Sequence, residues 1–554
     1  MPLKNLPELL CVQSDRLGNA TAIRYKQSGL YYDITWNQYW ETVQAVAAQL
    51  LQQGICPGDR VGLLGENSPQ WLMADMAILL SGAVTVPPHA PLTAQQVLFQ
   101  FRNTDVRWIF VSNVSQYNKI EPILDQLPSL KGVVVLSVSQ SQPNKYLSWT
   151  SFVNQGYQIL SGLDKQLEER YQSLNETSLA TIMYTSGTTG NPKGVMLTHG
   201  NLLSNAAAVN ESFPRTSTSV VLNWLPFSHI YARTVDHYLN LITGAVVCLA
   251  ESAETVVDNL REIHPTHISC VPRFYEKVMT AVEDSDPEVT KKRLRAIFGP
   301  RMEWLASGGA PLPVSLAEKY RDGGYLILQG YGLTESSPVI SFNHPDRYKL
   351  ESVGQAIPGV EIRIADDGEI LTRGPHVMPG YWDNSQATNE AIQDGWLYTG
   401  DLGTLDEDGF LHITGRKKEL LVLSNGKKII PTTIEGLLVS DVSIDQAIVY
   451  GEGKNYLTAL IVPNWDHIKS EVNEPDLVAK SYQELTENDS IITYMRNRMD
   501  RLLAELSNSE QIKRFILLPE PFSIEKEELT VSMKLRRNVI VNHHERILNE
   551  LYSS

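Results

Sequence analysis

Short apolar runs rich in β-branched residues alternate, over the first 400 or so residues, with longer stretches whose apolar residues recur at helical spacing. The runs 61–64, 108–111, 133–136 and 245–249 have the length and composition of buried strands, and 39–51 and 95–101 have the period of amphipathic helices. Strands that alternate with helices are typical of largely parallel sheets. The pattern therefore predicts an α/β fold for this part of the chain.

The spacing of apolar runs and turn residues changes from Val353 onward. There "VGQAIPGVEIRIADDGEILTRGPHVMPGYW" places short strands between Pro-Gly, Asp-Asp-Gly and Arg-Gly-Pro turns. This stretch predicts a β-rich subdomain. After Arg416 the sequence again predicts both strands and helices, with strands expected at 420–423, 446–450 and 457–462 and a charged helical region at 484–506. We therefore expect an N-terminal domain of residues 1–416 and a C-terminal domain of residues 417–554.

Composition excludes several classes of protein. A net charge of -16 argues against general nucleic-acid binding, which needs a basic face. The cysteines are scattered and form no C-x-x-C pair, so neither a zinc site nor a disulfide framework is expected. The first residues lack the apolar core of a signal peptide, and no apolar run approaches the ~18 residues of a membrane span. These features predict a cytoplasmic protein whose membrane contact, if any, is peripheral.

The end of the chain, "VIVNHHERILNELYSS", predicts an amphipathic helix. Its adjacent histidines, His543 and His544, cannot point the same way on one helix. We therefore expect a solvated helix face here rather than a pair of metal ligands.

Residues 184–194, "YTSGTTGNPKG", have the composition of a phosphate-binding loop. Glycines let successive N–H groups point at one anion, hydroxyl side chains add donors, and Lys193 adds a positive charge. A Walker P-loop has Gly and Lys adjacent and then Ser or Thr, whereas Pro192 and Gly194 flank the lysine here. The loop therefore predicts phosphate binding by a protein other than a P-loop kinase or ATPase.

This loop closely resembles the signature of the adenylate-forming enzymes, which include acyl-CoA synthetases, luciferases and peptide-synthetase adenylation domains. Further motifs follow in the expected order: "SGGAPL" at 307–312, "GYGLTE" at 330–335, "YTGDLG" at 398–403, "GRKKE" at 415–419 and a late lysine in "TVSMKLRR" at 530–537. The resemblance spans nearly the whole chain. It implies a large N-terminal domain of α/β subdomains with a β-rich subdomain, and a small mobile α+β C-terminal domain.

The resemblance also implies roles for individual residues. Thr185 and Glu335 would hold Mg2+, because hard oxygen ligands suit a hard cation shared with the phosphates of ATP. Tyr331 would stack on the adenine, Asp401 would accept hydrogen bonds from both ribose hydroxyls, and Arg416 would reach the same sugar.

The catalytic set implied by the resemblance adds Lys534, which would screen negative charge while a carboxylate displaces pyrophosphate from ATP, and His229, near the carboxylate end of the acyl pocket. The implied set that binds ATP and coenzyme A (CoA) is Thr185, Ser186, Gly187, Thr188, Thr189, Gly190, Lys193, Gly308, Gly309, Ala310, Gly330, Tyr331, Gly332, Thr334, Asp401, Arg416, Lys418 and Gly426.

In this family the small domain rotates between adenylation and thiol attack, and Lys418 matches the hinge position. The loop "LVLSNGKKIIP" follows at once, and its Asn-Gly pair predicts a two-residue hairpin turn of type I′. The resemblance implies that this loop lines the channel of the pantetheine arm, with Gly426 at the close approach.

The segment "LPFSHIYART" at 225–234 resembles the long-chain fatty acid branch of the family, although Ala232 and Arg233 stand where that branch usually has Glu-Arg. The leading hypothesis is a fatty acid:CoA ligase that uses ATP, Mg2+ and CoA on a medium- to long-chain acid. Two alternatives stay open: transfer of the acyl group to acyl carrier protein, and a non-catalytic nucleotide- or lipid-binding relative. The sequence leaves monomer and homodimer open as well.

Overall fold

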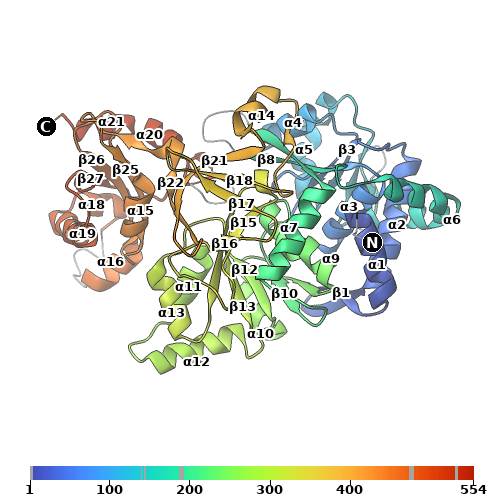
Figure 1. Ribbon diagram of the computed structural model, residues 1–554, viewed down its shortest axis with the longest axis horizontal. Helices are drawn as coiled ribbons and strands as arrows, with labels where there is room; N and C mark the ends of the chain where they lie inside the picture. The colour runs from blue at the N-terminus through green and yellow to red at the C-terminus, as the bar shows by residue number, and fades with distance from the viewer. Residues whose placement is uncertain are drawn as a thin grey trace.

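The computed structural model describes residues 4–138, 140–142, 145–185, 192–472, 480–523, 525–530 and 535–553. Figure 1 shows two large mixed sheets with their helices, a smaller antiparallel sheet, and a C-terminal body in orange to red at the left of the view. The described part of the chain contains no helix long and apolar enough to cross a membrane.

One large sheet has parallel inner strands and an antiparallel edge beyond β8. Its inner strands are mostly apolar and buried, because helices cover both faces. The strands, in spatial order, are β19 (Gly380–Tyr381), β9 (Lys193–Thr198), β8 (Leu179–Thr185), β4 (Val84–Val86), β3 (Arg60–Leu64), β5 (Trp108–Val111), β6 (Gly132–Val135) and β7 (Leu147–Ser148).

The two faces of this sheet belong to different hydrophobic clusters. Val61 and Leu63 of β3 pack into the cluster that holds the first helices of the chain, whereas Leu64 packs into the cluster of α4 and α5. On the first face lie α1 (Leu6–Leu17), α2 (Trp36–Gln52), α3 (Pro69–Leu80) and α6 (Trp149–Ser173); on the second lie α4 (Ala94–Asn103), α5 (Val114–Ile120) and η1 (Glu121–Gln126).

The second large sheet, like the first, has parallel inner strands, and its strands at both edges are antiparallel. Its strands, in spatial order, are β16 (Gln355–Ala356), β15 (Val339–Phe342), β14 (Ile327–Gly332), β13 (Trp304–Ser307), β12 (His267–Cys270), β10 (Val220–Asn223), β11 (Val246–Leu249), β1 (Thr21–Gln27) and β2 (Leu30–Thr35).

Helices again cover this sheet on both sides. One cluster contains residues of α10 (Val256–Ile263), α11 (Pro272–Val282), α12 (Pro287–Phe298) and α13 (Val314–Asp322); the other contains residues of α7 (His199–Ser212), α8 (Ile230–Ala232), η2 (Arg233–Tyr238) and α9 (Leu239–Thr243). The carboxyl ends of parallel strands meet at one edge of a sheet, where α/β proteins place their ligands. Several of the predicted site residues follow such strand ends.

The β-rich subdomain is an antiparallel sheet in the order β17 (Glu361–Ile364), β18 (Glu369–Arg373), β21 (Trp396–Leu405) and β20 (Ile392–Gln393), with β22 (Leu411–Arg416) also paired to β21. The short helix α14 (Ser385–Ala391) precedes β20. This subdomain carries Asp401 and Arg416 on neighbouring strands.

After η4 (Lys417–Glu419), the remaining described residues build their own hydrophobic clusters. Two small sheets form there: β23 (Leu421–Val422) pairs with β24 (Lys428–Ile429), and β25 (Ile444–Tyr450), β26 (Leu457–Pro463) and β27 (Ile512–Leu517) form the other. The helices are α15 (Pro431–Val439), α16 (Trp465–Val472), α18 (Tyr482–Thr486), α19 (Asp489–Leu502), α20 (Arg537–His543) and α21 (Glu545–Glu550).

The predicted α/β class with a small α+β C-terminal part is confirmed, but two local predictions are wrong. The predicted helical region at 484–506 is confirmed; it consists of two helices, because Asn488 caps a new helix with its side chain. The C-terminal helix is interrupted at His544, and this break lets His543 Nδ1 (3.2 Å) and His544 Nε2 (3.7 Å) approach the same oxygen, Oε1 of the buried Glu528.

The second wrong prediction is the two-residue turn. The last residues paired across the hairpin are Val422 and Lys428, so the loop between them has five residues. Of Asn425 and Gly426, only Gly426 has a positive φ, +80°. A type I′ turn needs positive φ at both residues, so the longer loop uses the glycine alone.

Candidate active site

Three predicted residues from three strands meet at one point. The Tyr331 hydroxyl, from β14, donates a hydrogen bond of 2.7 Å to Asp401 Oδ2, and Arg416 Nε lies 3.1 Å from Asp401 Oδ1. Asp401 of β21 and Arg416 of β22 are direct cross-strand partners. Asp401 is only 4 % exposed, while the Arg416 side chain is 42 % exposed. The result is a buried carboxylate held from two sides, with its arginine partner open to solvent.

The electrostatics of this cluster follow from burial and charge. Burial raises the pKa of the Tyr331 phenol well above its usual value, and the neighbouring Asp401 raises it further, so the phenol stays a hydrogen-bond donor. Burial lowers the pKa of Arg416, but Asp401 and Glu419 outweigh it and the pKa ends above its usual value. A cation and a neutral donor therefore face one carboxylate.

The backbone before Asp401 is held by a residue that the sequence reasoning missed. Glu369 of β18, a buried carboxylate, accepts the Gly400 N–H at 2.8 Å with Oε1 and the Lys417 ammonium at 2.7 Å with Oε2. One side chain thus links the turn that presents Asp401 to the residue that follows Arg416. The only sequence signal was its place after the Asp-Asp-Gly turn.

Lys417, rather than the predicted hinge residue Lys418, is anchored. Its Nζ lies 2.6 Å from Asp367 Oδ2 and 2.7 Å from Glu369 Oε2, and these hydrogen bonds raise the pKa of Lys417 above its usual value. Lys418, the next residue of η4, is exposed. Residues up to Lys417 are therefore tied to the β-rich subdomain, and the side chain of the next residue is open to solvent.

A second group of predicted residues lies along β9. Thr185 and Lys193 are direct cross-strand partners at the open end of the β8–β9 pair. The Lys193 ammonium lies over the ring of Tyr381, 4.8 Å from its centroid, and the Tyr381 hydroxyl donates a hydrogen bond of 2.9 Å to Glu335 Oε1. Tyr381 therefore joins two predicted residues, although no role was predicted for Tyr381 itself.

The loop that carries Glu335 is fixed by helix α7. Asn205 Nδ2 donates to the Val339 carbonyl at 2.7 Å, and Asn205 Oδ1 accepts the Val339 N–H at 3.1 Å. Asn201 Nδ2 donates to the carbonyls of Pro375 (2.7 Å) and Val377 (3.0 Å), on the segment that leads to Tyr381. One helix therefore holds both sides of the contact between Tyr381 and Glu335.

Three of the predicted glycines lie where a Cβ would come close to neighbouring residues. A Cβ on Gly332 would lie 1.9 Å from the Pro338 carbonyl oxygen, and one on Gly330 would lie 2.3 Å from the Phe342 ring, so both glycines are required by the close approach of β15. Gly308 follows the end of β13, where a Cβ would lie 3.2 Å from Cζ of Tyr231. Of the other members of these motifs, Gly309 and Ala310 lie in the segment after β13, and Thr334 begins the short helix η3 (Thr334–Ser336) after β14.

His229 lies in the loop between β10 and α8. Its Nδ1 accepts the Tyr231 N–H at 3.2 Å, and its ring stacks on that of His89 with the centroids 6.1 Å apart. His89 also contacts the Ser228 hydroxyl at 2.8 Å, and burial lowers its pKa to about 4. His89, missed in the sequence, is therefore a neutral ring beside His229 at neutral pH.

Arg233 keeps the arginine of the long-chain branch, whereas Ala232 replaces its glutamate, and Arg233 is fully buried. Its guanidinium pairs with Asp75 of α3, including a contact of Nε to Oδ2 at 3.2 Å, and donates to the Thr181 hydroxyl of β8 at 2.8 Å. Tyr238 donates to the same carboxylate at 2.8 Å. The arginine therefore connects η2 to the strand that ends at Thr185.

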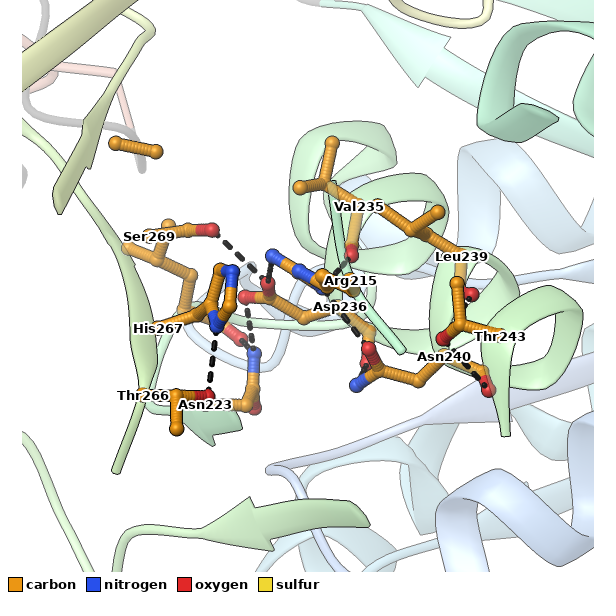
Figure 2. Close-up of polar contacts among 12 residues, drawn as sticks. Arg215, Asn223, Val235, Asp236, Leu239, Asn240, Thr243, Thr266, His267 and Ser269 are labelled. Atoms are coloured by element: carbon orange, nitrogen blue, oxygen red, sulfur yellow. Dashed lines mark hydrogen bonds and ion pairs between the residues drawn. The ribbon is translucent and has the colours of Figure 1, made fainter. Parts of the chain in front are cut away.

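A second buried ion pair holds the other side of η2. Figure 2 shows the side chains of Arg215, Asn223 and Ser269 pointing toward Asp236, with distances to its carboxylate of 3.3, 3.2 and 2.9 Å. Burial raises the pKa of Asp236 even though Arg215 opposes the shift. Because Asn223 and Ser269 lie on β10 and β12, this network fixes η2 on the strand ends beside His229.

The predicted CoA-facing loop lies against the C-terminal part in this conformation. Among the described residues, no atom lies within 4 Å of a Cβ placed on Gly426, and Lys427 Nζ contacts the hydroxyls of Ser507 (3.3 Å) and Ser509. The remaining predicted residues, Ser186, Gly187, Thr188, Thr189, Gly190 and Lys534, lie outside the described residues.

Comparisons with known proteins identify the family. The model of the AMP-binding enzyme family matches residues 12–382, and that of the AMP-binding enzyme C-terminal domain matches residues 418–554. The long-chain-fatty-acid--CoA ligase FadD15 of Mycobacterium bovis is 31% identical over 95% of this chain and 93% of its own.

Two solved structures share the fold. The adenylation domain of a carboxylate reductase from Mycobacterium chelonae superposes with a TM-score of 0.78 at 22% identity, over 100% of this chain and 92% of its own. O-succinylbenzoate Coenzyme A Synthetase from Bacillus subtilis, in complex with ATP and magnesium ion, gives 0.72 at 23% identity, over 96% and 98%. With the family models covering most of the sequence, the chain belongs to the AMP-binding enzyme family.

Proposed function

We propose that the protein is an AMP-forming fatty acid:CoA ligase. A carboxylate oxygen of the acid attacks the α-phosphorus of ATP and pyrophosphate leaves, which forms an acyl adenylate. The thiol of CoA then attacks the acyl carbonyl and AMP leaves, which forms the thioester. The observation that best supports this reaction is the meeting of Tyr331, Asp401 and Arg416 from three motifs far apart in the sequence.

The Asp401 carboxylate would bind the ribose. Its Oδ2 accepts a hydrogen bond from Tyr331 and its Oδ1 forms an ion pair with Arg416, and a carboxylate oxygen offers about two acceptor sites. One site per oxygen remains for the two neighbouring hydroxyls of a ribose. Tyr331 would lie against the base, and Lys193, with the loop that precedes it, would bind the phosphates.

Thr185 and Glu335 would hold Mg2+. A hydroxyl and a carboxylate fit this ion, because Mg2+ takes hard oxygen ligands and commonly binds through one or two protein groups plus substrate phosphates. Bound there, the ion would neutralise charge on the phosphates. The protein's own contribution is to hold the Glu335 carboxylate in place, through the Tyr381 hydroxyl and the bonds between α7 and Val339.

The acyl group would lie near His229, with a medium- to long-chain acid as substrate. The relative from Mycobacterium bovis is named a long-chain-fatty-acid--CoA ligase. The buried network around η2 would hold this wall of the site rigid, because its charged groups are bonded on both sides of the element.

The domain boundary is proposed at Arg416, with Lys418 as the hinge and the C-terminal domain carrying Lys534. This division is supported by the separate hydrophobic clusters on either side and by the anchoring of Lys417 to Glu369. Lys534 would serve the first half-reaction by screening charge on the departing pyrophosphate. Rotation about residue 418 would then present Gly426 and its loop to the thiol.

CoA is the acceptor we propose, in line with the name of the curated relative. The alternative of a carrier protein as acceptor has no comparable support. A non-catalytic relative is expected to lack at least one residue of the chemistry, yet Thr185, Lys193, Glu335, Asp401 and Lys534 are all present. We place the enzyme in the cytoplasm with at most peripheral membrane contact, as a monomer or homodimer that size-exclusion chromatography would distinguish.

The test measures the half-reactions separately on a panel of fatty and aromatic acids. Pyrophosphate release without a thiol reports adenylation, and thioester formation is then compared between CoA and holo acyl carrier protein. We expect both activities with fatty acids and CoA; absence of pyrophosphate release with every acid would refute the proposal. Lys534→Ala should abolish most pyrophosphate release while sparing thioester formation from supplied acyl adenylate.

A further inference from the structure

Tyr381 lies between two residues of the nucleotide site that are far apart in the sequence. It belongs to β19, where it pairs with Val195 of β9, so that Lys193, two residues earlier on the same face of β9, reaches its ring diagonally. The ring is 8 % exposed, and the hydroxyl donates to Glu335 Oε1 at 2.9 Å. Within the described residues, this is the one side-chain hydrogen bond that the Glu335 carboxylate accepts.

The backbone of Tyr381 is fixed independently of its hydroxyl. Its N–H donates to the Thr388 hydroxyl at 2.9 Å, and the next residue, Trp382, donates its N–H to the Gly194 carbonyl at 2.7 Å. The backbone around Glu335 is tied to the same segment, since the Met378 N–H donates to the Glu335 carbonyl at 2.9 Å. Removing the hydroxyl alone should therefore leave the ring in place.

The two contacts of Tyr381 have different consequences. A hydrogen bond to one oxygen of Glu335 limits the rotation of the carboxylate and directs the other oxygen away from the phenol. A ring face under the Lys193 ammonium attracts the cation without consuming its hydrogen-bond donors. Partners of this kind, which touch a ligating group rather than the ion, set the orientation of the ligand and its affinity for the metal.

We propose that Tyr381 is a positioning residue for the magnesium–nucleotide complex: its hydroxyl orients the Glu335 carboxylate and its ring restrains the Lys193 ammonium. This inference rests on the proposed function, because the roles of Glu335 and Lys193 come from it. It adds a residue from the β19 edge of the sheet to a site that contains Lys193 of β9 and Glu335 after β14.

The decisive variant is Tyr381→Phe, which removes only the hydroxyl. Binding of Mn2+ in the presence of α,β-methylene-ATP is measured by electron paramagnetic resonance, independently of turnover. We expect about 10-fold weaker Mn2+ binding, the lower range for loss of a partner of a metal ligand. The Mg2+ concentration for half-maximal pyrophosphate release should rise by a similar factor, with activity restored by excess Mg2+ and an unchanged KM for the fatty acid.

A matched control is Tyr31→Phe, which removes a hydroxyl bonded to Glu262 at 2.6 Å at the edge of the other large sheet. It should leave Mn2+ binding unchanged. A double-mutant cycle with Glu335→Gln separates positioning from general stability, because loss of the Tyr381 hydroxyl should cost little further Mn2+ affinity once the carboxylate is gone.

Wild-type Mn2+ affinity in Tyr381→Phe, or additive losses in the cycle, would overturn the inference even if the variant were less stable to urea. Tyr381→Leu removes the ring as well and should raise the KM for ATP beyond that of Tyr381→Phe; equal values would refute the contribution of the ring. If the wild-type protein instead shows no ATP-dependent pyrophosphate release with any acid, the proposed function fails, a result distinct from these.

Discussion

The role of Asp401 can be tested by Asp401→Asn, which keeps the shape of the side chain and removes its charge. In the structure Oδ2 accepts a hydrogen bond from Tyr331 and Oδ1 forms an ion pair with Arg416, so one site per oxygen remains for a ribose hydroxyl. A hydrogen bond to a charged group contributes about 1 kcal/mol more than a neutral one. Two such bonds predict a loss of about 2 kcal/mol in ATP binding, or about 30-fold in Kd.

The assay is isothermal titration calorimetry with ATP and with 2′-deoxy-ATP, in the absence of fatty acid. The wild-type protein should prefer ATP by about 30-fold, because the deoxy analogue loses one charge-assisted bond. In Asp401→Asn this preference should shrink to about 5-fold, the value of a neutral bond. The difference between the two nucleotides isolates the ribose contact from any general loss of affinity.

Two results would refute this reasoning. An unchanged preference for ATP over 2′-deoxy-ATP in Asp401→Asn would show that the carboxylate does not touch the ribose. An equal loss in the control Asp33→Asn, whose partner Arg24 lies 2.7 Å away on the surface, would show a nonspecific effect of charge. Urea unfolding should report only about 1 kcal/mol of destabilisation for Asp401→Asn, since Arg416 is partly solvated.

Three further predictions concern the hinge, the core and the pH dependence. Lys417→Met and Lys418→Pro should each slow thioester formation more than pyrophosphate release. The first variant removes the ion pair between Lys417 and Glu369 next to the proposed hinge, and the second restricts the backbone of the proposed hinge residue. An equal loss in both half-reactions would contradict this prediction. Arg233→Met should lower the free energy of unfolding by about 3–5 kcal/mol in urea titrations by leaving Asp75 buried without its cation, and adding Asp75→Asn should recover part of the loss. Burial lowers the pKa of His376 to about 4, so the unfolded chain binds the proton before the folded protein does as the pH falls below 6.5. The free energy of unfolding should therefore drop by about 2 kcal/mol between pH 7 and pH 5. In urea titrations, the pH dependence of His376→Gln should be smaller by that amount.

Local pattern was enough to predict the elements and their class. Apolar runs such as 108–111 and 61–64 became inner strands of a sheet, because their length and composition suit burial on both faces. Predictions that depended on the exact end of an element failed at Asn425 and at His544, where caps and turn geometry decided the outcome. Ordered motifs likewise indicated Tyr331, Asp401 and Arg416 before any contact between them was known.

Residues that act through another side chain carried no such signal. Tyr381 and Glu369 sit in turn-rich sequence with ordinary neighbours, and their importance comes from contacts with Glu335, Lys193 and Lys417 across the fold. The buried charges of η2 were also invisible, since a lone arginine or aspartate in a sequence is expected at the surface.

The sequence by itself therefore determined the α/β class and the family of this protein, because periodicity and ordered motifs are local properties. Only the tertiary structure decided that Lys417 pairs with Asp367 and Glu369 and that the phenol of Tyr381 bonds to Glu335. The physical reason is that hydrogen bonds and ion pairs depend on distances between side chains, and the packing of separate sheets and helices, rather than spacing along the chain, sets those distances.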